Sequence, residues 1–302
     1  MTLQIKKINA SSFELPQIEQ PNEPTEQLQR TDEWHEKRNG SWNGSKIKGI
    51  MTCNKKGGSL SWDMPEKIKM FSSGIIAQVY EIAMQRKTNQ WIKSKGTPEM
   101  KYGTRIEPIL DAIGAEMLSH LGDVIEVGSK AFDDFPNARA SSDGVLVNRE
   151  TQRTIAICEK KACVSWNSHY KRTYEPMDEK SIDFWQTQME MRAHNVDHGY
   201  YFVASPPKDI FKYLNYDGDI MDLREDFEKE CFVELQKIEA SPFHQTALFE
   251  RIKICEQAVR VWIDDGGRLD DVFWDVVNGV REVVANDKKE VKDDINLDDI
   301  PF

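Results

Sequence analysis

The fold is decided by the stretch from Arg139 to Lys161, which contains Ala140-Ser141-Ser142-Asp143-Gly144-Val145, a polar turn over 148–153, and Thr154-Ile155-Ala156-Ile157-Cys158-Glu159-Lys160-Lys161. Two short β-like runs joined by polar turn residues predict a β-hairpin. Because side chains alternate along a strand, Glu159 and Lys161 share one face and Lys160 takes the other. Asp143 begins the partner strand and is then within reach of Glu159.

This hairpin would bring two carboxylates and an ammonium group to one point. Carboxylate oxygens suit a hard cation such as Mg²⁺, and a lysine beside the metal can orient an attacking water and offset charge on a phosphate. The same three residue types also occur in an exposed hairpin with an ordinary salt bridge. The rest of the sequence has to decide between these two interpretations.

Composition indicates a soluble globular protein, with 39% hydrophobic and 30% charged residues in 302. The sequence has neither an apolar run long enough to cross a membrane nor the apolar core of a signal peptide at 1–10. The five cysteines are scattered without a C-x-x-C pair, so no disulfide framework, zinc site or iron–sulfur site is indicated. We therefore expect a reducing, cytoplasmic location.

The net charge of −11 is unusual for a protein that acts on DNA, but the charge is unevenly distributed. Residues 31–131 carry 15 Lys and Arg against 12 Asp and Glu, whereas 263–302 carry 5 against 12. The acidity is concentrated at the C-terminal end, and a basic surface for DNA is compatible with the rest.

Periodicity and punctuation predict the organisation of the remaining chain. Residues 1–28, which contain three prolines, are expected to form a mobile arm, and 46–69, which contain six lysines, a flexible basic loop. We expect strands at 123–132 and 199–205, and helices at 64–87, from Thr104 onward, and at 180–195, 222–239, 243–263 and 270–285. His194 and His198 have metal-ligand spacing but no third ligand, and are interpreted as structural.

Three further positions have both a structural and a functional interpretation. Thr31 or Asp32 can cap a short helix that carries Arg38. Arg38 and Ser45 can both bind a phosphate, or be ordinary surface residues. Glu107 is either the acid of a capping box with Thr104 or a third carboxylate near the metal.

Taken in order, these motifs resemble one family over residues 29–240, namely the phage lambda exonuclease type of viral recombinase nuclease, also called YqaJ-like, within the PD-(D/E)xK nuclease superfamily. The motifs that carry the resemblance are the Trp34…Arg38…Gly40 segment, the Gly103…Glu107 helix, Asp133, Ser141-Ser142-Asp143-Gly144, Glu159-Lys160-Lys161, and Gln186-Thr187-Gln188-Met189. The resemblance implies an α/β fold, in which a central mixed sheet is flanked by helices. Residues 241–302 have no counterpart in it, and the helical spacing of their apolar residues predicts a helical extension at 241–286.

The resemblance also implies roles for individual residues. Asp143, Glu159 and the backbone carbonyl of Lys160 would hold Mg²⁺, for which Mn²⁺ is an alternative, and Glu107 would help with a second ion. Lys161 would position the nucleophilic water, and Gln186 would orient Lys161 or that water. Asp133 would lie close to the active site. The 5′ phosphate would be bound by Arg38, Ser45 and Ser141.

The sequence departs from the family pattern at three points. Ser142 replaces a proline, and Lys160 replaces an apolar residue between the catalytic Glu and Lys. The arginine that follows the catalytic lysine in the family is missing, because that region reads Trp166-Asn167-Ser168. Lys171 and Arg172 are the nearest basic residues for this role.

The activity implied is 5′-to-3′ digestion of one strand of double-stranded DNA, in a ring-shaped homotrimer, leaving a 3′ overhang for a single-strand-annealing protein. Two alternatives remain open, namely another PD-(D/E)xK endonuclease and an inactive DNA-binding scaffold with a nuclease fold.

The C-terminal end, within an acidic stretch at 287–302 expected to be disordered, resembles the tip of bacterial single-stranded-DNA-binding proteins. It predicts a partner-binding segment of Asp298, Asp299, Ile300, Pro301 and Phe302. The partner would be the annealing protein or another reader of that tip. The alternative interpretation is a tail that occupies the nuclease's own basic channel.

Overall fold

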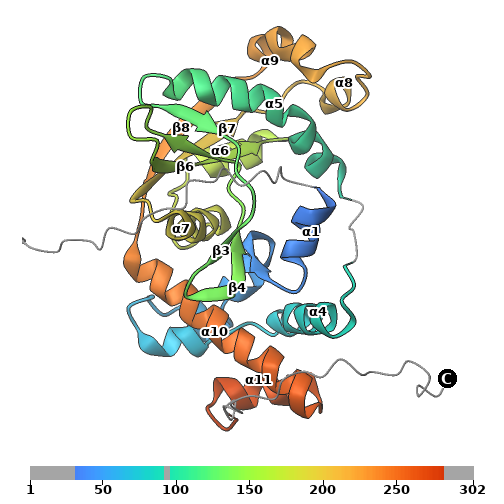
Figure 1. Ribbon diagram of the computed structural model, residues 1–302, viewed down its shortest axis with the longest axis vertical. Coiled ribbons are helices and arrows are strands. Elements are labelled where there is room, and N and C mark those ends of the chain that lie inside the picture. The colour runs from blue at the N-terminus through green and yellow to red at the C-terminus, as the bar shows by residue number, and fades with distance from the viewer. Residues whose placement is uncertain (1–30, 92–95, 282–302) are drawn as a thin grey trace, which may run out of the picture.

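The structure is a computed structural model that describes residues 31–91 and 96–281, and it is organised around two β-sheets. The larger sheet has the strand order β2-β5-β6-β7-β8 and is mixed, because β6 and β7 run parallel while the other neighbours are antiparallel. Helices flank it, so the expected α/β class is confirmed (Figure 1). Its strands are β2 (Asp123–Ile125), β5 (Gly144–Val147), β6 (Thr154–Ala162), β7 (His198–Ala204) and β8 (Val233–Glu239).

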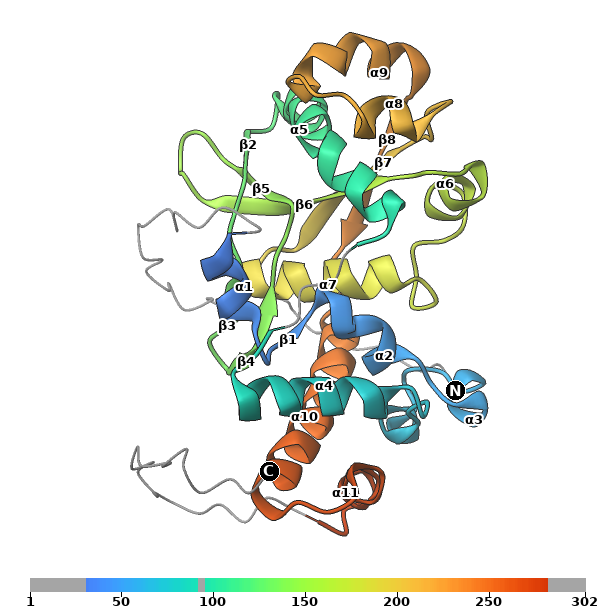
Figure 2. The same cartoon turned by 90° about the vertical axis from the view of Figure 1, so that its right-hand side faces the viewer.

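The predicted hairpin is confirmed as β5 and β6, with Gly144 opposite Cys158. The connection from β6 to the parallel strand β7 contains α6 (Trp166–Thr173) and α7 (Ile182–His194). Helix α5 (Pro98–Leu118) covers one face of the sheet and α7 the other (Figure 2). Coverage on both faces explains why β7 is an almost continuous apolar run in the sequence.

The smaller sheet carries the chain toward the hairpin. It contains β1 (Trp42–Asn43), β4 (Phe135–Ala140) and β3 (Lys130–Phe132), in the order β1-β4-β3. β4 is parallel to β1 and antiparallel to β3, and it ends three residues before Asp143. This sheet therefore links the N-terminal segment to the start of β5.

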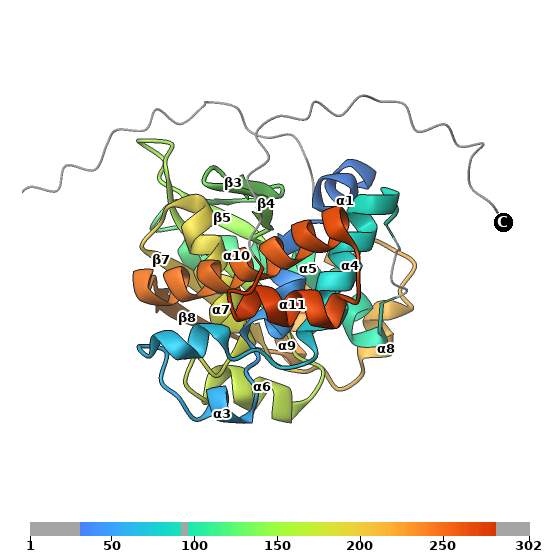
Figure 3. The ribbon, with the colours of Figure 1, turned by 90° about the horizontal axis from the view of Figure 1, so that it is seen from below.

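Helix α10 is the main support of the lower half of the molecule, where it runs from α7 toward α11 (Figure 3). Its buried side chains share one hydrophobic core with those of α2, α4, α7 and α11. The remaining helices are α1 (Asp32–Arg38), η1 (Gly44–Lys46), α2 (Ile47–Met51), α3 (Lys55–Gly58), η2 (Pro65–Lys69), α4 (Ile75–Thr88), α8 (Ile210–Leu214), η3 (Ile220–Leu223), α9 (Arg224–Glu230), α10 (Pro242–Asp265) and α11 (Leu269–Val277).

A buried carboxylate on α10, Glu256, connects distant parts of the chain. It accepts hydrogen bonds from Trp42 Nε1 on β1 at 2.9 Å, from Arg86 on α4 at 2.9 and 2.8 Å, and from Asn137 Nδ2 on β4 at 2.6 Å. Burial alone would raise the pKa of Glu256, but Arg86 and the other donors keep it below the usual value. Glu256 is therefore ionised, and it is a hub that joins β1, α4 and β4 to α10.

The segment 46–69 is packed and largely helical, so the expectation of a flexible loop is wrong. A second group on α10, the fully buried guanidinium of Arg251, donates to the carbonyl oxygens of Ile50 at 2.6 Å, Lys67 at 2.9 Å and Thr52 at 3.3 Å. Ile50 is itself buried. The six lysines of this segment had concealed that it also contains buried apolar residues such as Ile50.

Two helix boundaries also differ from the prediction. Over 64–87 the chain forms η2, a break at Met70, and then α4, because Phe71 is extended and bridges Cys53. The helix expected from Thr104 begins instead at Pro98, where the Thr97 hydroxyl accepts a hydrogen bond from the Met100 amide at 3.3 Å. Thr104 lies inside the helix, so its capping box with Glu107 is wrong.

Three expected elements are divided or shorter. The strand expected at 123–132 is two strands, because β2 pairs in the large sheet and β3 in the small one. The helix expected at 222–239 ends at Glu230 and is followed by β8, which pairs with β7 along the sheet edge. The last helix, α11, ends at Val277 within the expected 270–285.

The predicted boundary at 240/241 falls between β8 and α10. The expected arm at 1–28 and the acidic stretch at 287–302 lie outside the described residues. None of the helices in 31–91 and 96–281 combines the length and apolar character needed to span a membrane.

Candidate active site

The site is built on the end of the β5–β6 hairpin, where Asp143 and Lys160 clamp each other. The Lys160 amide donates to Asp143 Oδ2 at 2.8 Å, and Lys160 Nζ donates to the Asp143 carbonyl oxygen at 3.0 Å. Lys160 Nζ also forms an ion pair with Asp111 of α5. This double contact fixes the Asp143 carboxylate beside β6.

Glu159 points to the opposite face of the sheet, as the alternation predicts, and is 1% exposed. Its Oε1 accepts hydrogen bonds from Lys161 Nζ at 2.5 Å and from Gln186 Nε2 at 2.7 Å. Its Oε2 is buried and has no hydrogen-bond partner. Burial raises the pKa of Glu159 to about 7, the charge of Asp143 adds to the increase, and Lys161 opposes it.

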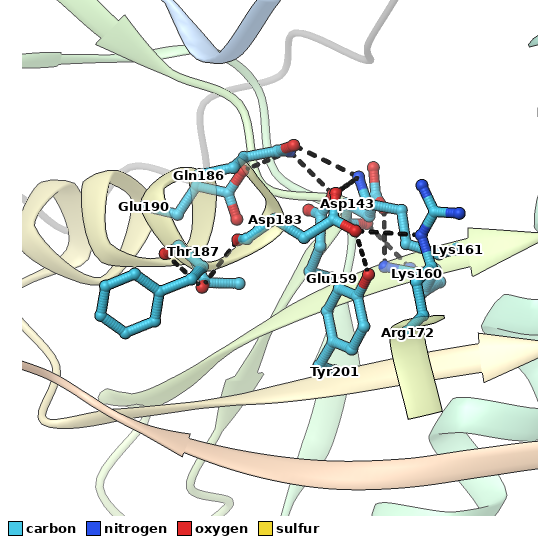
Figure 4. Close-up of polar contacts among 11 residues, drawn as sticks. Asp143, Glu159, Lys160, Lys161, Arg172, Asp183, Gln186, Thr187, Glu190 and Tyr201 are labelled. Atoms are coloured by element: carbon cyan, nitrogen blue, oxygen red, sulfur yellow. Dashed lines mark hydrogen bonds and ion pairs between the residues drawn. The ribbon is translucent and has the colours of Figure 1, made fainter. Parts of the chain in front are cut away.

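Lys161 lies between Glu159 and the first half of α7 (Figure 4). Its Nζ donates to Gln186 Oε1 at 3.2 Å and is 3.9 Å from Asp183 Oδ1. Burial alone would lower the pKa of Lys161, but Glu159, Asp183 and Asp143 hold it above the usual value. Lys161 is therefore protonated, and the expected contact between Gln186 and Lys161 is present.

Two acidic residues of α7 belong to this site and were missed from the sequence. Glu190 accepts a hydrogen bond from Gln186 Nε2 at 2.9 Å, and its other oxygen is buried without a partner. Burial, and then the charge of Glu159, raise the pKa of Glu190 well above the usual value. Asp183 and Glu190 lie three residues before and four after Gln186, a helical spacing that could have identified them.

The residues expected at a phosphate divide into two groups. Arg38 of α1 donates to Ser141 Oγ at 2.9 Å and packs over the Trp34 ring at 4.0 Å, so two of them are in contact. Burial, and then the charge of Arg139, lower the pKa of Arg38 to about 10, against the charge of Glu190. Arg38 is still a cation at neutral pH, on the Glu190 side of the site.

Ser45 is held in η1 beside this group. Its hydroxyl donates to Asn43 Oδ1 at 2.6 Å. The preceding residue, Gly44, lies against Gln186, since a Cβ placed there would be 3.6 Å from Gln186 Cγ. The structure thus brings the Ser45 segment to the edge of the cluster around Glu159.

Lys171 and Arg172 lie in α6, at the other end of the site. Arg172 Nε donates to Asp183 Oδ2 at 2.9 Å, and Tyr201 donates to the same oxygen at 2.7 Å. Burial would raise the pKa of Asp183, but Lys161 and Arg172 keep it low. Arg172 is therefore engaged with a carboxylate, and Lys171 is exposed to solvent.

The two remaining acidic candidates have different positions. Glu107 is half-buried on α5, one turn before Asp111 and thus on the helix face that contacts Lys160. Asp133 is exposed in the turn between β3 and β4. The whole of β4 separates it from Asp143, so its expected place close to the active site is wrong.

A divalent cation fits the residues present. Asp143 and Glu159 place two acidic groups side by side, and the orphaned Glu159 Oε2 is a buried acceptor of the kind a cation satisfies. No group of three or more His, Cys, Asp or Glu side chains within 31–91 and 96–281 forms a complete metal site. Any ion would thus need a further donor, such as a backbone carbonyl.

His194 and His198, expected to be structural, belong to no group of three His, Cys, Asp or Glu side chains that could hold a metal ion within the described residues. His194 is buried at the end of α7, and burial and then Lys130 lower its pKa to about 4. His198 Nδ1 is 2.5 Å from Asp197 Oδ1. Neither contributes to the cluster around Glu159.

The sequence matches no protein-family model and no curated protein. Solved structures that share its architecture include exonucleases. The alkaline exonuclease LHK-Exo from Laribacter hongkongensis aligns with a TM-score of 0.53 at 18% identity, over 78% of this chain and 95% of that one. Its complex with dAMP gives 0.54 at 19% identity over the same shares. A phage related exonuclease from Haemophilus somnus 129PT gives 0.55 at 14%, over 75% and 96%.

The chain has the fold of these exonucleases. This agrees with the α/β, PD-(D/E)xK-type core expected from the sequence. At these identities the likeness shows the fold, and the chemistry has to be argued from the site.

Proposed function

We propose that this protein is a Mg²⁺-dependent exonuclease that digests one strand of double-stranded DNA in the 5′-to-3′ direction. The observation that carries the proposal is the buried Glu159 carboxylate, held between Lys161 and Gln186 beside Asp143. Two acidic groups and one ammonium at a single point suit the hydrolysis of a phosphodiester. The similar structures are exonucleases by name, which supports the same class.

Asp143 and Glu159 would hold the ion, with Mn²⁺ as a possible substitute for Mg²⁺, and Glu107 would assist from α5. The Lys160 carbonyl is a further donor, because the N–H and C=O of one strand residue point to the same edge and the Lys160 amide already faces Asp143. When bound, the ion supplies Lewis-acid stabilisation of charge at phosphorus. Lys161 orients the attacking water, and Gln186 holds Lys161 in place.

End recognition is assigned to Arg38, Ser141 and Ser45. A guanidinium bound to a serine hydroxyl can exchange that contact for a terminal 5′ phosphate, which forms stronger, charge-assisted hydrogen bonds. An endonuclease has no need of such a pocket. The arrangement therefore favours an exonuclease over another PD-(D/E)xK endonuclease.

The biological setting proposed is single-strand-annealing recombination in a bacterial host cytoplasm. The 3′ overhang produced would be passed to an annealing protein, and a homotrimeric ring would keep the enzyme on its substrate. The Asp298–Phe302 tip would recruit that partner. These parts of the proposal are supported by the sequence resemblance alone.

The test is digestion of linear duplexes, with and without 5′ phosphates, and of closed circular DNA. With Mg²⁺ we expect loss of the phosphorylated linear duplex from its 5′ ends, no cleavage of the circle, and no activity in Asp143→Ala. Digestion of the circle would support the endonuclease alternative. Absence of Mg²⁺-dependent cleavage in the wild-type protein would support the inactive scaffold.

Arg38→Ala tests end recognition separately. Loss of one charge-assisted phosphate contact should cost about 1.5–3 kcal/mol in the preference for 5′-phosphorylated ends. Lys37→Ala, on the same helix and exposed, is the matched control and should keep the preference. Equal loss of rate on both kinds of end in Arg38→Ala would contradict the assignment.

A further inference from the structure

Helix α6 exposes a row of aromatic side chains to solvent. Trp166 is 62% exposed, Tyr170 56% and Tyr174 65%. Trp166 and Tyr170 lie in α6 and Tyr174 is its C-cap residue, so the spacing of four residues places the three rings along one side of the helix. An aromatic surface left in water marks an interaction site, because such rings are among the most favourable groups to bury.

The rings are arranged as two neighbouring pairs. Trp166 lies 6.2 Å from Phe232 of the segment before β8, with a tilt of 33° between the rings. Tyr170 and Tyr174 are 5.7 Å apart with a tilt of 31°. Within each pair the rings are therefore tilted against each other, neither stacked nor edge-on.

This row lies directly beside the candidate active site. Helix α6 begins four residues after the end of β6, which carries Glu159 and Lys161. The adjacent face of α6 lines an open pocket of about 580 Å³, to which α6 contributes Asn167, Ser168, Lys171 and Arg172 and α7 contributes Asp183. Asp183, which lines this pocket, lies 3.9 Å from Lys161 Nζ through its Oδ1, and Figure 4 shows both side chains.

The charge and spacing of this face suit an unpaired nucleic acid strand. Helix α6 contains Lys171 and Arg172 and no acidic residue, but the pocket beside it is also lined by Glu175, Asp178 and Asp183, and Arg172 is bound to Asp183. The exposed Lys171 is therefore the cation of this face that is available to a phosphate backbone. Four residues of helix advance by about 6 Å, whereas bases in a duplex strand are about 3.4 Å apart. Rings with this spacing match bases that have been separated from the stack.

We propose that the aromatic row Trp166, Tyr170 and Tyr174 is a stacking platform for unpaired bases of the DNA strand whose backbone is held at Glu159 and Lys161. This inference rests on the proposed nuclease function and deepens it. Lys171 contacts the backbone of that strand, and the rings accept any base, because every base has a π-face. The platform holds the strand in single-stranded form next to the point of cleavage.

The test is fluorescence anisotropy with a labelled oligothymidine single strand and a blunt duplex of equal length, in Ca²⁺ to limit cleavage. Trp166→Ala and Tyr170→Ala should each weaken single-strand binding about 5- to 150-fold. Trp166→Phe should retain most of the affinity. Tyr80→Ala is the matched control, because Tyr80 is 49% exposed on the distant helix α4, and it should bind like the wild type.

Wild-type affinity for the single strand in all three alanine variants, Trp166→Ala, Tyr170→Ala and Tyr174→Ala, would overturn the platform. The platform would also be overturned if these alanine variants bound the single strand like the wild type but had a lower molar mass in light scattering. That result would show that the aromatic row contacts a second copy of the chain. A wild-type protein that binds the single strand but never cleaves with Mg²⁺ would overturn the proposed nuclease function instead. The two failures are therefore distinguishable.

Discussion

Lys160 is a charged residue at an interior position, between two residues of the candidate active site. Its side chain is 1% exposed, whereas its partner Asp111 is 48% exposed. Burial alone would lower the pKa of Lys160, but Asp111 and Asp143 raise it above the usual value. Removing Lys160 and removing Asp111 should therefore lower the free energy of unfolding by different amounts, because only the Lys160 ammonium is sealed from water.

We expect Asp111→Asn to destabilise the protein more than Lys160→Met. The first change leaves a buried cation without its counter-charge, at a cost of about 1–3 kcal/mol, while the second leaves a carboxylate that water can solvate. Urea unfolding measures both. The double variant should recover part of the loss of Asp111→Asn, and additive losses would contradict the pairing.

Lys161→Ala should lower turnover by at least about 10²-fold, because it removes the one ammonium that contacts Glu159 and Gln186 within the described residues. DNA affinity should change far less, since the lysine acts on the water and on developing charge. Single-turnover rates and binding in Ca²⁺ separate the two effects. Lys229→Ala, an exposed lysine on α9, is the control, and unchanged turnover in Lys161→Ala would remove it from the mechanism.

At the scale of elements, α7 organises the site. One face carries Asp183, Gln186 and Glu190 toward β6, and the opposite face packs into the lower core with Trp185 and Met189. The helix ends at Asn195, which adopts a left-handed conformation with φ 52° and whose amide donates to the Arg192 carbonyl oxygen. His194 is buried in this last turn.

His194 should make stability fall as the pH decreases. Its pKa is about 4 in the native protein against 6.5 for the free group. Between these values the unfolded chain binds more protons, so protonation favours unfolding, by up to about 3 kcal/mol. Unfolding free energies of the wild type and His194→Leu, measured from pH 7 downward, should diverge in this window. Parallel pH profiles would show that His194 is protonated in the native state.

For the molecule as a whole, prediction from the sequence succeeded best at residues whose secondary-structure pattern and side-chain chemistry point to the same role. The Asp143/Glu159/Lys161 hairpin and Gln186 on its helix were predicted, and Arg38 and Ser141 were expected at one phosphate, but their direct contact was not predicted. Periodicity failed where tertiary contacts override it. The lysines of 46–69 concealed a segment held by Arg251, 184 to 201 residues away in sequence, and no local pattern encodes such a contact.

The spacing from Gln186 indicates that Glu190 shares a helix face with it, but neither the burial of Glu190 nor the exposure of the aromatic row could be read from the local sequence. An exposed Trp166 and a buried tryptophan look alike in a sequence, and a helical glutamate is most often a surface residue. Asp133 shows the converse error, since a correct spacing from Asp143 along the chain was taken as proximity. Because the chain between Asp133 and Asp143 contains the extended strand β4, these ten residues separate the two carboxylates in space.

The predicted C-terminal tip would connect the whole molecule to other proteins. Deleting Phe302 should abolish binding to the annealing protein, since the ring and the terminal carboxylate would both leave the partner's pocket. Activity on naked DNA should stay unchanged. Pull-down and digestion assays measure the two properties, and higher activity in the deletion would show that the tail is autoinhibitory.

The hub at Glu256 has a consequence for the order in which the protein is made. Trp42, Arg86 and Asn137 leave the ribosome long before the carboxylate that receives their hydrogen bonds, 214 residues after Trp42. Until then, Trp42 of β1, Arg86 of α4 and Asn137 of β4 lack the carboxylate that joins these elements. A nascent or prematurely terminated chain therefore carries the β5–β6 hairpin before these elements are fixed, and under the proposed function it would act on DNA ends only once synthesis has passed α10.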